Sequence, residues 1–187
     1  KIPFKSPIPF NVTVPTKALS DLSSVFDEND DVKMAIENNR MLFKNDKTLM
    51  IARLIEDAYP ETKQLIPDSF TQILKVDRAL LRSAVDRAAL INAEGKNVVR
   101  LEITNEQIRI TSLSRQIGSS LESLKTVSYE GDPLVISCSG KYLYDALGAL
   151  QSENVVLYFR GELKPIIIKN EDDESVVQLI SPVRSYE

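Results

Sequence analysis

Three segments of the chain carry apolar residues at intervals of three and four positions, the pattern of an amphipathic helix. The pattern predicts helices at about residues 16–28, 77–92 and 140–152. Each segment follows a short apolar stretch and begins near a residue with a side-chain oxygen, namely Thr16, Asp77 or Ser139. We interpret these three residues as N-caps, because such oxygens accept hydrogen bonds from the free N–H groups of a first helical turn.

Each predicted helix has one apolar face that is expected to be buried. The face of the first helix consists of Leu19, Leu22, Val25 and Phe26. The face of the second consists of Leu80, Leu81, Ala84, Val85 and Ala88. The face of the third consists of Leu143, Ala146, Leu147 and Leu150.

Strand-like stretches follow each helix, and turn-like residues separate them. They read DVKMAI, RMLFK and LMIARLI after the first helix, VVRLEI, QIRITSL and SLKTVSY after the second, and VVLYF, PIIIK and VVQLI after the third. Because few residues separate neighbouring stretches, we expect antiparallel meanders. The predicted fold class is therefore α+β, with repeated βαβββ units in which one helix packs on one face of an antiparallel sheet.

The unit occurs three times, and its number affects the expected domain organisation. A single helix on a small sheet leaves the core open, so such units should pair. The second and third units, residues 69–187, are predicted to form one complete domain. The first unit, residues 1–68, is then half of another domain. Its mate is expected upstream of Lys1, in a longer protein of which this chain is the C-terminal part.

Composition argues against an enzyme. The chain has no histidine, so it lacks the usual general base near neutral pH and the commonest metal ligand. Its single cysteine, Cys138, lies in an apolar stretch and is expected to be a buried, reduced thiol. We find no phosphate-binding glycine loop and no calcium-binding loop. The sequence therefore predicts no catalytic residue, no metal and no cofactor.

Charge and hydropathy bear on partners and location. The net charge is −4, whereas a protein that holds phosphates tightly is usually basic. Any contact with nucleic acid is therefore expected to be loose. No apolar run is long enough to span a bilayer and no signal-peptide pattern opens the chain, so we expect a cytoplasmic protein without a membrane partner.

Five segments carry a resemblance to a known family. They are VPTKALSDLSSVF, ARLIEDAYPETKQLIP, DRALLRSAVDRAALI, GKYLYDALGALQSENV and QLISPVRSYE. In this order and spacing they resemble the second half of the β sliding clamp, the processivity subunit of the bacterial replicative DNA polymerase III, in its Gram-positive form. The resemblance implies the DNA clamp fold, in which each domain contains two such units and two subunits form a ring.

The resemblance also implies function and partners. The intact protein is expected to be a homodimer that encircles duplex DNA in the cytoplasm during DNA replication, with only weak direct DNA contacts. It is expected to tether clients that carry short linear motifs. These are the catalytic subunit of the replicative polymerase, the clamp loader, translesion polymerases and mismatch-repair proteins.

Site residues follow from the same resemblance. The peptide-binding groove is expected to contain Pro60, Gln64, Leu65, Ser139, Tyr142, Leu163, Pro165, Leu179, Ser181, Pro182, Val183 and Arg184. The residues expected to face DNA are Lys17, Arg78, Arg82, Arg87 and Lys141. Leu90 and Ile91 are expected at the dimer interface. Gln64 stands where many relatives have arginine, so a charge contact at that edge is not expected.

Two alternatives belong to other functional classes. One is a peptide-binding adaptor module that uses the same groove outside replication. The other is an enzyme with an unconventional carboxylate pair, Asp86 and Glu94, although nothing in their spacing supports it.

Overall fold

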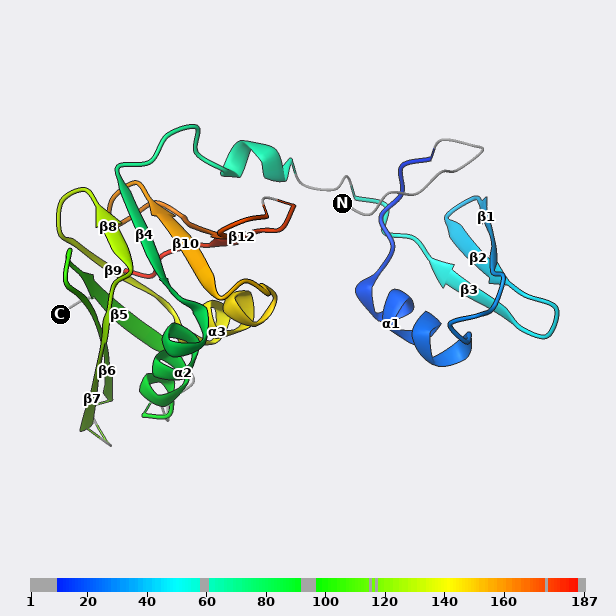
Figure 1. The fold of residues 1–187 in the computed structure, drawn as a ribbon. Coiled ribbons are helices and arrows are strands. Elements are labelled where there is room, and N and C mark those ends of the chain that lie inside the picture. Colours follow the sequence, from blue (N-terminus) through cyan, green and yellow to red (C-terminus); the bar gives the residue numbers. More distant parts are fainter. Residues whose placement is uncertain are drawn as a thin grey trace. The chain divides into compact units, whose positions relative to one another are not determined.

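The computed structural model describes residues 10–57, 61–91, 97–114, 116, 118–173 and 175–184 (Figure 1). The chain divides into two compact units, residues 2–61 and residues 62–187, which we call the small unit and the large unit.

The small unit contains one helix and one sheet. Its elements are α1 (Thr16–Val25), β1 (Lys33–Glu37), β2 (Arg40–Lys44) and β3 (Leu49–Arg53), and the sheet has the antiparallel order β1-β2-β3. Asn38 has a φ of 53° in the two-residue turn between β1 and β2, a left-handed conformation that asparagine tolerates well. Phe26, Met41, Phe43, Ala52 and Leu54 form a small core.

The large unit contains two sheets, two α-helices and a short 3₁₀ helix. Its first elements are η1 (Thr62–Leu65), β4 (Gln72–Asp77), α2 (Arg78–Ala89), β5 (Val98–Ile103), β6 (Gln107–Ser114) and β7 (Gly118–Lys125). The remaining elements are β8 (Ser128–Glu130), β9 (Leu134–Ser139), α3 (Gly140–Gly148), β10 (Asn154–Phe159), β11 (Ile166–Asn170) and β12 (Val177–Ile180). The sheet orders are β12-β11-β10-β4-β8 and β7-β6-β5-β9.

The two repeats of the large unit exchange strands. β4 precedes α2 but pairs with β10 of the following repeat, with Leu74 opposite Leu157. Reciprocally, β9 precedes α3 but pairs with β5 of the preceding repeat, with Ile136 opposite Leu101. Each repeat thus completes the sheet of the other, and the α+β class with antiparallel sheets is confirmed.

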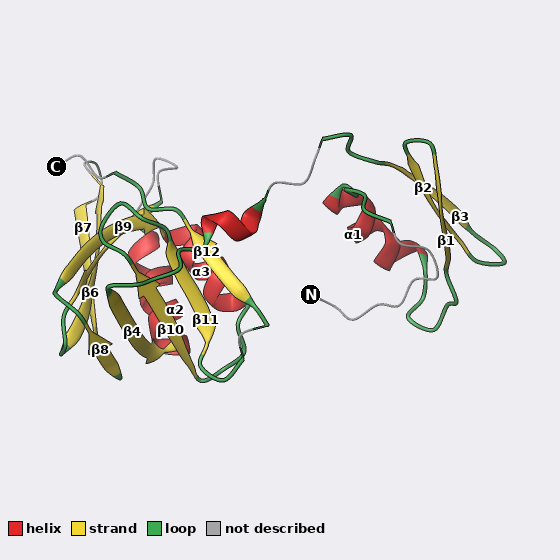
Figure 2. Cartoon of the chain, turned by 90° about the horizontal axis from the view of Figure 1, so that it is seen from above, coloured by secondary structure: helices red, strands yellow, loops and turns green. Residues whose placement is uncertain are grey.

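Helices α2 and α3 pack against each other and against the sheets (Figure 2). One continuous core of buried side chains joins them. Leu81, Ala84, Val85 and Ala88 of α2 are buried. All four predicted core residues of the third helix are buried too. Cys138 is also fully buried, as predicted, and burial raises the pKa of its thiol to about 12.

Several local predictions were wrong. Thr16 is the first helical residue and Pro15 is the N-cap, which has no side-chain acceptor to bond the helix. Leu80 is 59% exposed, because this third residue after the N-cap faces solvent. Leu19 and Val25 of α1 are likewise exposed, at 50% and 45%. The SLKTVSY stretch is split between β7 and β8, which belong to different sheets.

Candidate functional site

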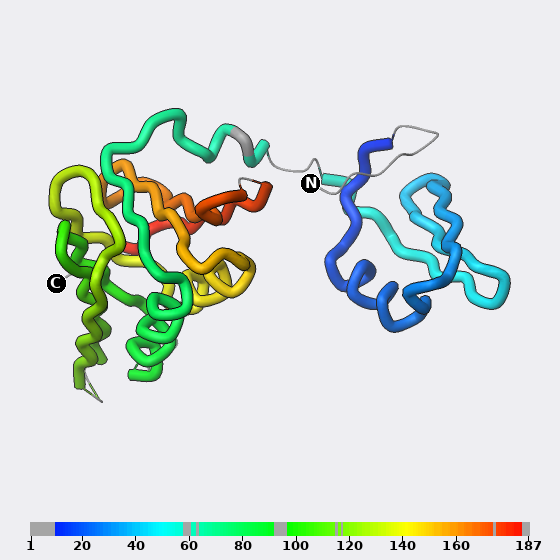
Figure 3. Tube along the Cα trace, in the orientation of Figure 1, coloured from blue at the N-terminus to red at the C-terminus, as the bar shows by residue number. Residues whose placement is uncertain are grey.

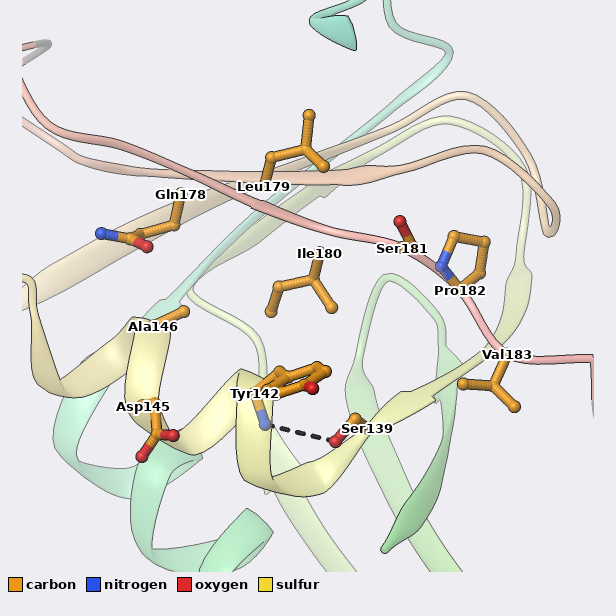
Figure 4. A pocket seen from close by; sticks show the side chains of 10 residues that line it. All are labelled: Ser139, Tyr142, Asp145, Ala146, Gln178, Leu179, Ile180, Ser181, Pro182 and Val183. Carbon is orange, nitrogen blue, oxygen red and sulfur yellow. Dashed lines mark hydrogen bonds between the residues drawn. The ribbon is translucent and has the colours of Figure 1, made fainter. Parts of the chain in front are cut away.

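A hollow of about 550 Å³ lies between α3 and the C-terminal part of the described chain (Figure 4). Its lining comes from the start of α3, from β12 and from the residues after β12. The lining residues are Ser139, Tyr142, Asp145, Ala146, Gln178, Leu179, Ile180, Ser181, Pro182 and Val183.

The start of α3 is held by its cap and by a close backbone contact. The backbone N–H of Tyr142 donates to Oγ of the N-cap Ser139 at 3.3 Å. The N–H of Gly140 donates to the carbonyl oxygen of Asn97 at 2.7 Å. A Cβ on Gly140 would lie 2.6 Å from Oδ1 of Asn97, so a larger residue would require either the Asn97 side chain or the helix start to shift. These contacts fix the base from which Tyr142 projects.

The stretch after β12 is held against β9. β12 pairs with β11 and ends at Ile180, because Pro182 has no N–H to continue a ladder. The chain then crosses from β12 to β9 (Figure 3). There Pro182 forms a bridge with Cys138, and the N–H of Val183 donates to the carbonyl oxygen of Ser137 at 2.8 Å. Residues 181–183, which we call the terminal stretch, therefore form a fixed wall of the hollow.

The hollow has an apolar floor and an exposed aromatic edge. Ile180 is 4% exposed and points from β12 toward Tyr142, whereas Leu179 points to the opposite side of the strand (Figure 4). Tyr142 itself is 64% exposed and Val183 is 38% exposed. A large aromatic side chain beside a concave apolar surface is typical of a site that binds an extended peptide.

The charge at the rim is balanced within the protein. Nζ of Lys141 lies 2.7 Å from Oδ2 of Asp145, one helical turn away. The hydrogen bond to this carboxylate raises the pKa of Lys141, so the Lys141 ammonium stays charged over the neutral range. The hollow consequently offers mainly apolar contacts and neutral polar groups.

Six of the twelve residues predicted for the groove line this hollow. They are Ser139, Tyr142, Leu179, Ser181, Pro182 and Val183. Gln64, Leu65, Leu163, Pro165 and Arg184 lie in the large unit outside the lining. Leu65 and Leu163 are exposed, at 54% and 61%. Pro60 lies outside the described residues.

Sequence reasoning missed Asp145, Ala146, Gln178 and Ile180 of the lining. Ala146 follows Tyr142 by four residues, which places both on one face of a helix. Gln178 and Ile180 alternate with Leu179 along β12, so they project from the opposite face of the strand. These spacings are the sequence signal that could have placed Ala146, Gln178 and Ile180 in the lining.

The three arginines predicted to face DNA have partners inside the large unit. Nε of Arg78 donates to the carbonyl oxygen of Ser152 at 2.9 Å. The guanidinium of Arg82 lies 4.1 Å from the centre of the Tyr144 ring. Nη2 of Arg87 lies 2.7 Å from a carboxylate oxygen of Glu122.

Lys17, which is also predicted to face DNA, lies exposed on α1 in the small unit. The predicted interface pair directly follows α2, with Leu90 77% exposed and Ile91 half-buried. Both predictions concern contacts with molecules other than this chain, so they stay predictions.

Among the residues that the structure describes, no group of three or more histidine, cysteine or acidic side chains is placed to hold a metal ion. None of their helices is long and apolar enough to cross a membrane. Asp86 is exposed on α2, whereas its suggested catalytic partner Glu94 lies outside the described residues.

Comparison with known proteins decides the family. The family model for the DNA polymerase III beta subunit, C-terminal domain, matches residues 63–184, and the model for its central domain matches residues 1–61. The chain belongs to the bacterial β sliding clamp family. The resemblance seen in the sequence is thereby confirmed.

Curated relatives and solved structures agree with this assignment. The beta sliding clamps of Staphylococcus epidermidis and Staphylococcus aureus are 38% and 37% identical to this chain over 94% of its length. The chain spans 47% of each of these relatives. They bear out the Gram-positive form that was predicted.

Among solved structures, the Bacillus subtilis sliding clamp is 38% identical with a TM-score of 0.85, and the match covers 96% of this chain and 49% of that one. The Streptococcus pneumoniae beta chain is 33% identical with a TM-score of 0.88, and the match covers 97% of this chain and 49% of that one. A clamp from Bartonella birtlesii, 26% identical with a TM-score of 0.84 over 93% of this chain and 47% of that one, was solved bound to griselimycin.

Proposed function

We propose that the hollow between α3 and β12 is a peptide-binding groove of a DNA polymerase processivity factor. One observation carries the proposal, namely the exposed Tyr142 ring beside a hollow whose opposite wall is the fixed terminal stretch. An extended peptide would place apolar side chains over Ile180 and against Pro182 and Val183. The neutral polar groups of Ser139, Ser181 and Gln178 would orient its backbone.

The other predicted groove residues remain part of the proposal. Leu65 and Leu163 are exposed leucines of the large unit, and exposed leucines suit the outer part of an apolar groove. Gln64, Pro165, Arg184 and Pro60 are proposed on the family resemblance. The adaptor alternative gains no support from the relatives and solved structures described above, which are named as sliding clamps or polymerase III beta chains.

We further propose that the intact protein acts without catalysis, by enclosure and tethering. A dimeric ring would hold duplex DNA topologically, and the groove would raise the concentration of polymerase at the primer end. Clamp loader, translesion polymerases and mismatch-repair proteins would use the same groove in the cytoplasm. Leu90 and Ile91 would contribute to the contact between subunits, and residues 1–68 and 69–187 would be the half and the complete clamp domain.

Weak DNA contacts suit this mechanism. In the large unit, Arg82 lies against an aromatic ring, and Arg87 and Lys141 pair with carboxylates. The carboxylates partly neutralise Arg87 and Lys141, and all three cations would interact with phosphates mainly at a distance or through water. A ring that must slide gains from loose contacts, which also fits the net charge of −4.

The groove is tested by titrating this chain into a fluorescein-labelled peptide that contains the clamp-binding segment of a replicative polymerase. We expect saturable binding by fluorescence polarisation. Val183→Asp should weaken it about tenfold or more, because a charge would enter an apolar wall. Val127→Asp is the matched control, since Val127 is an exposed valine of the large unit outside the hollow. Equal affinities for the two variants would contradict the proposed groove.

A further inference from the structure

The hollow between α3 and β12 has two ends with different chemistry. The two elements run along it in opposite directions, so later residues of α3 and earlier residues of β12 line the same end (Figure 4). Asp145, Ala146 and Gln178 line this end, which we call the polar end. Pro182 and Val183 line the other end. An extended peptide lying along the hollow would therefore meet different groups at its two ends.

The polar end offers two acceptor oxygens to a ligand. The Asp145 carboxylate binds Lys141 through Oδ2 at 2.7 Å, and Oδ1 is its second oxygen. Gln178 is half-buried on β12, and its amide supplies both an oxygen acceptor and N–H donors. In the part of the chain that the structure describes, no residue hydrogen-bonds with Oδ1 of Asp145 or with the Gln178 side chain. Both groups are therefore available to a bound peptide.

Ala146 leaves room for an aliphatic chain at the polar end. Its side chain is a single methyl group, which Figure 4 shows between those of Gln178 and Asp145. Lysine and arginine both carry a charged head on an aliphatic stem. Such a stem would lie on Ala146, and the N–H groups of the head would donate to both acceptors. The polar end thus combines an apolar contact with acceptors, as a long basic side chain requires.

The protein already places one cation on this carboxylate. Lys141 approaches Asp145 from the preceding turn of α3 and is not among the lining residues. The side chains of Lys141 and Asp145 are 66% and 54% exposed. An ion pair so exposed holds its partners weakly, because water screens the charges and both side chains lose conformational freedom. A cation of a bound peptide can therefore compete with Lys141 for Asp145.

We propose that the polar end binds a lysine or arginine of the client peptide, next to the apolar residues of that peptide. This inference rests on the peptide-binding function proposed above and names the class of peptide, one with a basic flank. Charge complementarity favours it, because Asp145 is the one charged side chain among the described residues that line the hollow. The net charge of −4 acts in the same direction. An acidic peptide side chain at this end would face the Asp145 carboxylate and be repelled.

Lys141 and Asp145 should then have opposite effects on binding. Asp145 attracts the cation of the peptide, whereas Lys141 occupies the same carboxylate and repels a second cation. Removing the Asp145 charge should weaken the binding of a basic peptide, and removing the Lys141 charge should strengthen it. A general loosening of α3 would weaken binding in both variants. The opposite signs therefore distinguish recognition of a charge from a structural role.

The test uses fluorescence polarisation with fluorescein-labelled peptides that share the clamp-binding segment of a replicative polymerase. The peptides carry arginine, alanine or glutamate at the position before or after this segment. At low ionic strength, we expect arginine at one of these positions to tighten binding about two- to fivefold relative to alanine, and glutamate to weaken it. Asp145→Asn should abolish the advantage of arginine, and Lys141→Met should increase it. Added salt should reduce it.

Asp21→Asn is the matched control, because Asp21 is an exposed aspartate of α1 in the small unit and follows Lys17 by four residues. It changes the net charge as Asp145→Asn does, and it should keep the advantage of arginine. Equal binding of all peptides, a preference for glutamate, or an arginine advantage that survives Asp145→Asn would overturn this inference and leave the groove in place. Weaker binding of the arginine peptide by Lys141→Met would overturn it too. Absence of binding by every peptide would instead overturn the groove, and this inference with it.

Discussion

The large unit and the small unit contain the same repeat but bury it to different extents. In the large unit, two repeats exchange strands and share one core around α2 and α3. In the small unit, one repeat has a core of five buried residues under α1, and apolar side chains remain exposed on the same helix and on β1.

The difference teaches that an apolar pattern identifies residues that can be buried, whereas a partner repeat decides whether they are. Leu19 and Leu143 occupy the same position in their helices, yet only Leu143 is covered. The free energy that each residue contributes should differ accordingly, because hydrophobic stabilisation scales with the apolar area removed from water.

The largest expected effect is a difference in the free energy of unfolding between alanine substitutions at these two leucines. Leu143→Ala should lower the free energy of unfolding by about 2–5 kcal/mol, because it leaves a cavity in a close-packed core. Leu19→Ala should lower the free energy of unfolding by about 0.5 kcal/mol or less, because the Leu19 side chain is already half exposed to solvent in the folded protein. Urea unfolding followed by circular dichroism at low protein concentration measures both. Similar losses would show that the small unit covers Leu19 by itself.

A smaller difference in stability is expected between substitutions at the N-termini of α2 and α1. Oδ1 of Asp77 accepts from the N–H of Leu80 at 2.8 Å, so Asp77→Ala should cost about 1 kcal/mol of stability. Thr16→Ala should cost no more than a few tenths, because the N-cap of α1 is Pro15 and makes no side-chain bond. The same urea titration measures the two changes. A loss of about 1 kcal/mol at Thr16 would show that its hydroxyl caps the helix after all.

The sequence predicted the repeat, the helices and most of the large core, because periodicity and turn residues are local signals. It did not predict strand exchange. The alternation in β4 and β10 indicates which face is buried, but it carries no information on which strand lies alongside. The exposure of Leu80 was missed for a related reason, since the edge of an apolar helix face depends on how the partner helix crosses it.

Six groove residues that line the hollow came from the family resemblance, and their chemistry alone gave no such signal. Tyr142 on an apolar helix face and Leu179 on a strand both have the pattern of core residues. Only the crossing of the terminal stretch from β12 to β9 leaves a hollow beside them. That crossing depends on the Pro182 bridge, a contact between residues far apart in sequence.

The smallest expected effect is on stability at low pH, and it concerns one ion pair in each unit. Arg87 and Glu122 lie 2.7 Å apart, and the hydrogen bond from Arg87 holds the pKa of Glu122 below its usual value. The stability that this pair contributes is fully present above the ordinary pKa of a glutamate. It is lost as the pH falls through the lowered pKa of Glu122.

Glu122→Gln should therefore remove a small part of the acid sensitivity of the large unit, and added salt should weaken the effect. The corresponding change in the small unit is Glu56→Gln. Glu56 lies 3.6 Å from Arg53, and both side chains are more than two-thirds exposed. An ion pair as exposed as this one contributes little to stability, so Glu56→Gln should change the unfolding temperature less than Glu122→Gln does. Thermal unfolding between pH 3 and pH 7 compares the two variants, and a larger change for Glu56→Gln would reverse the ranking of the two pairs.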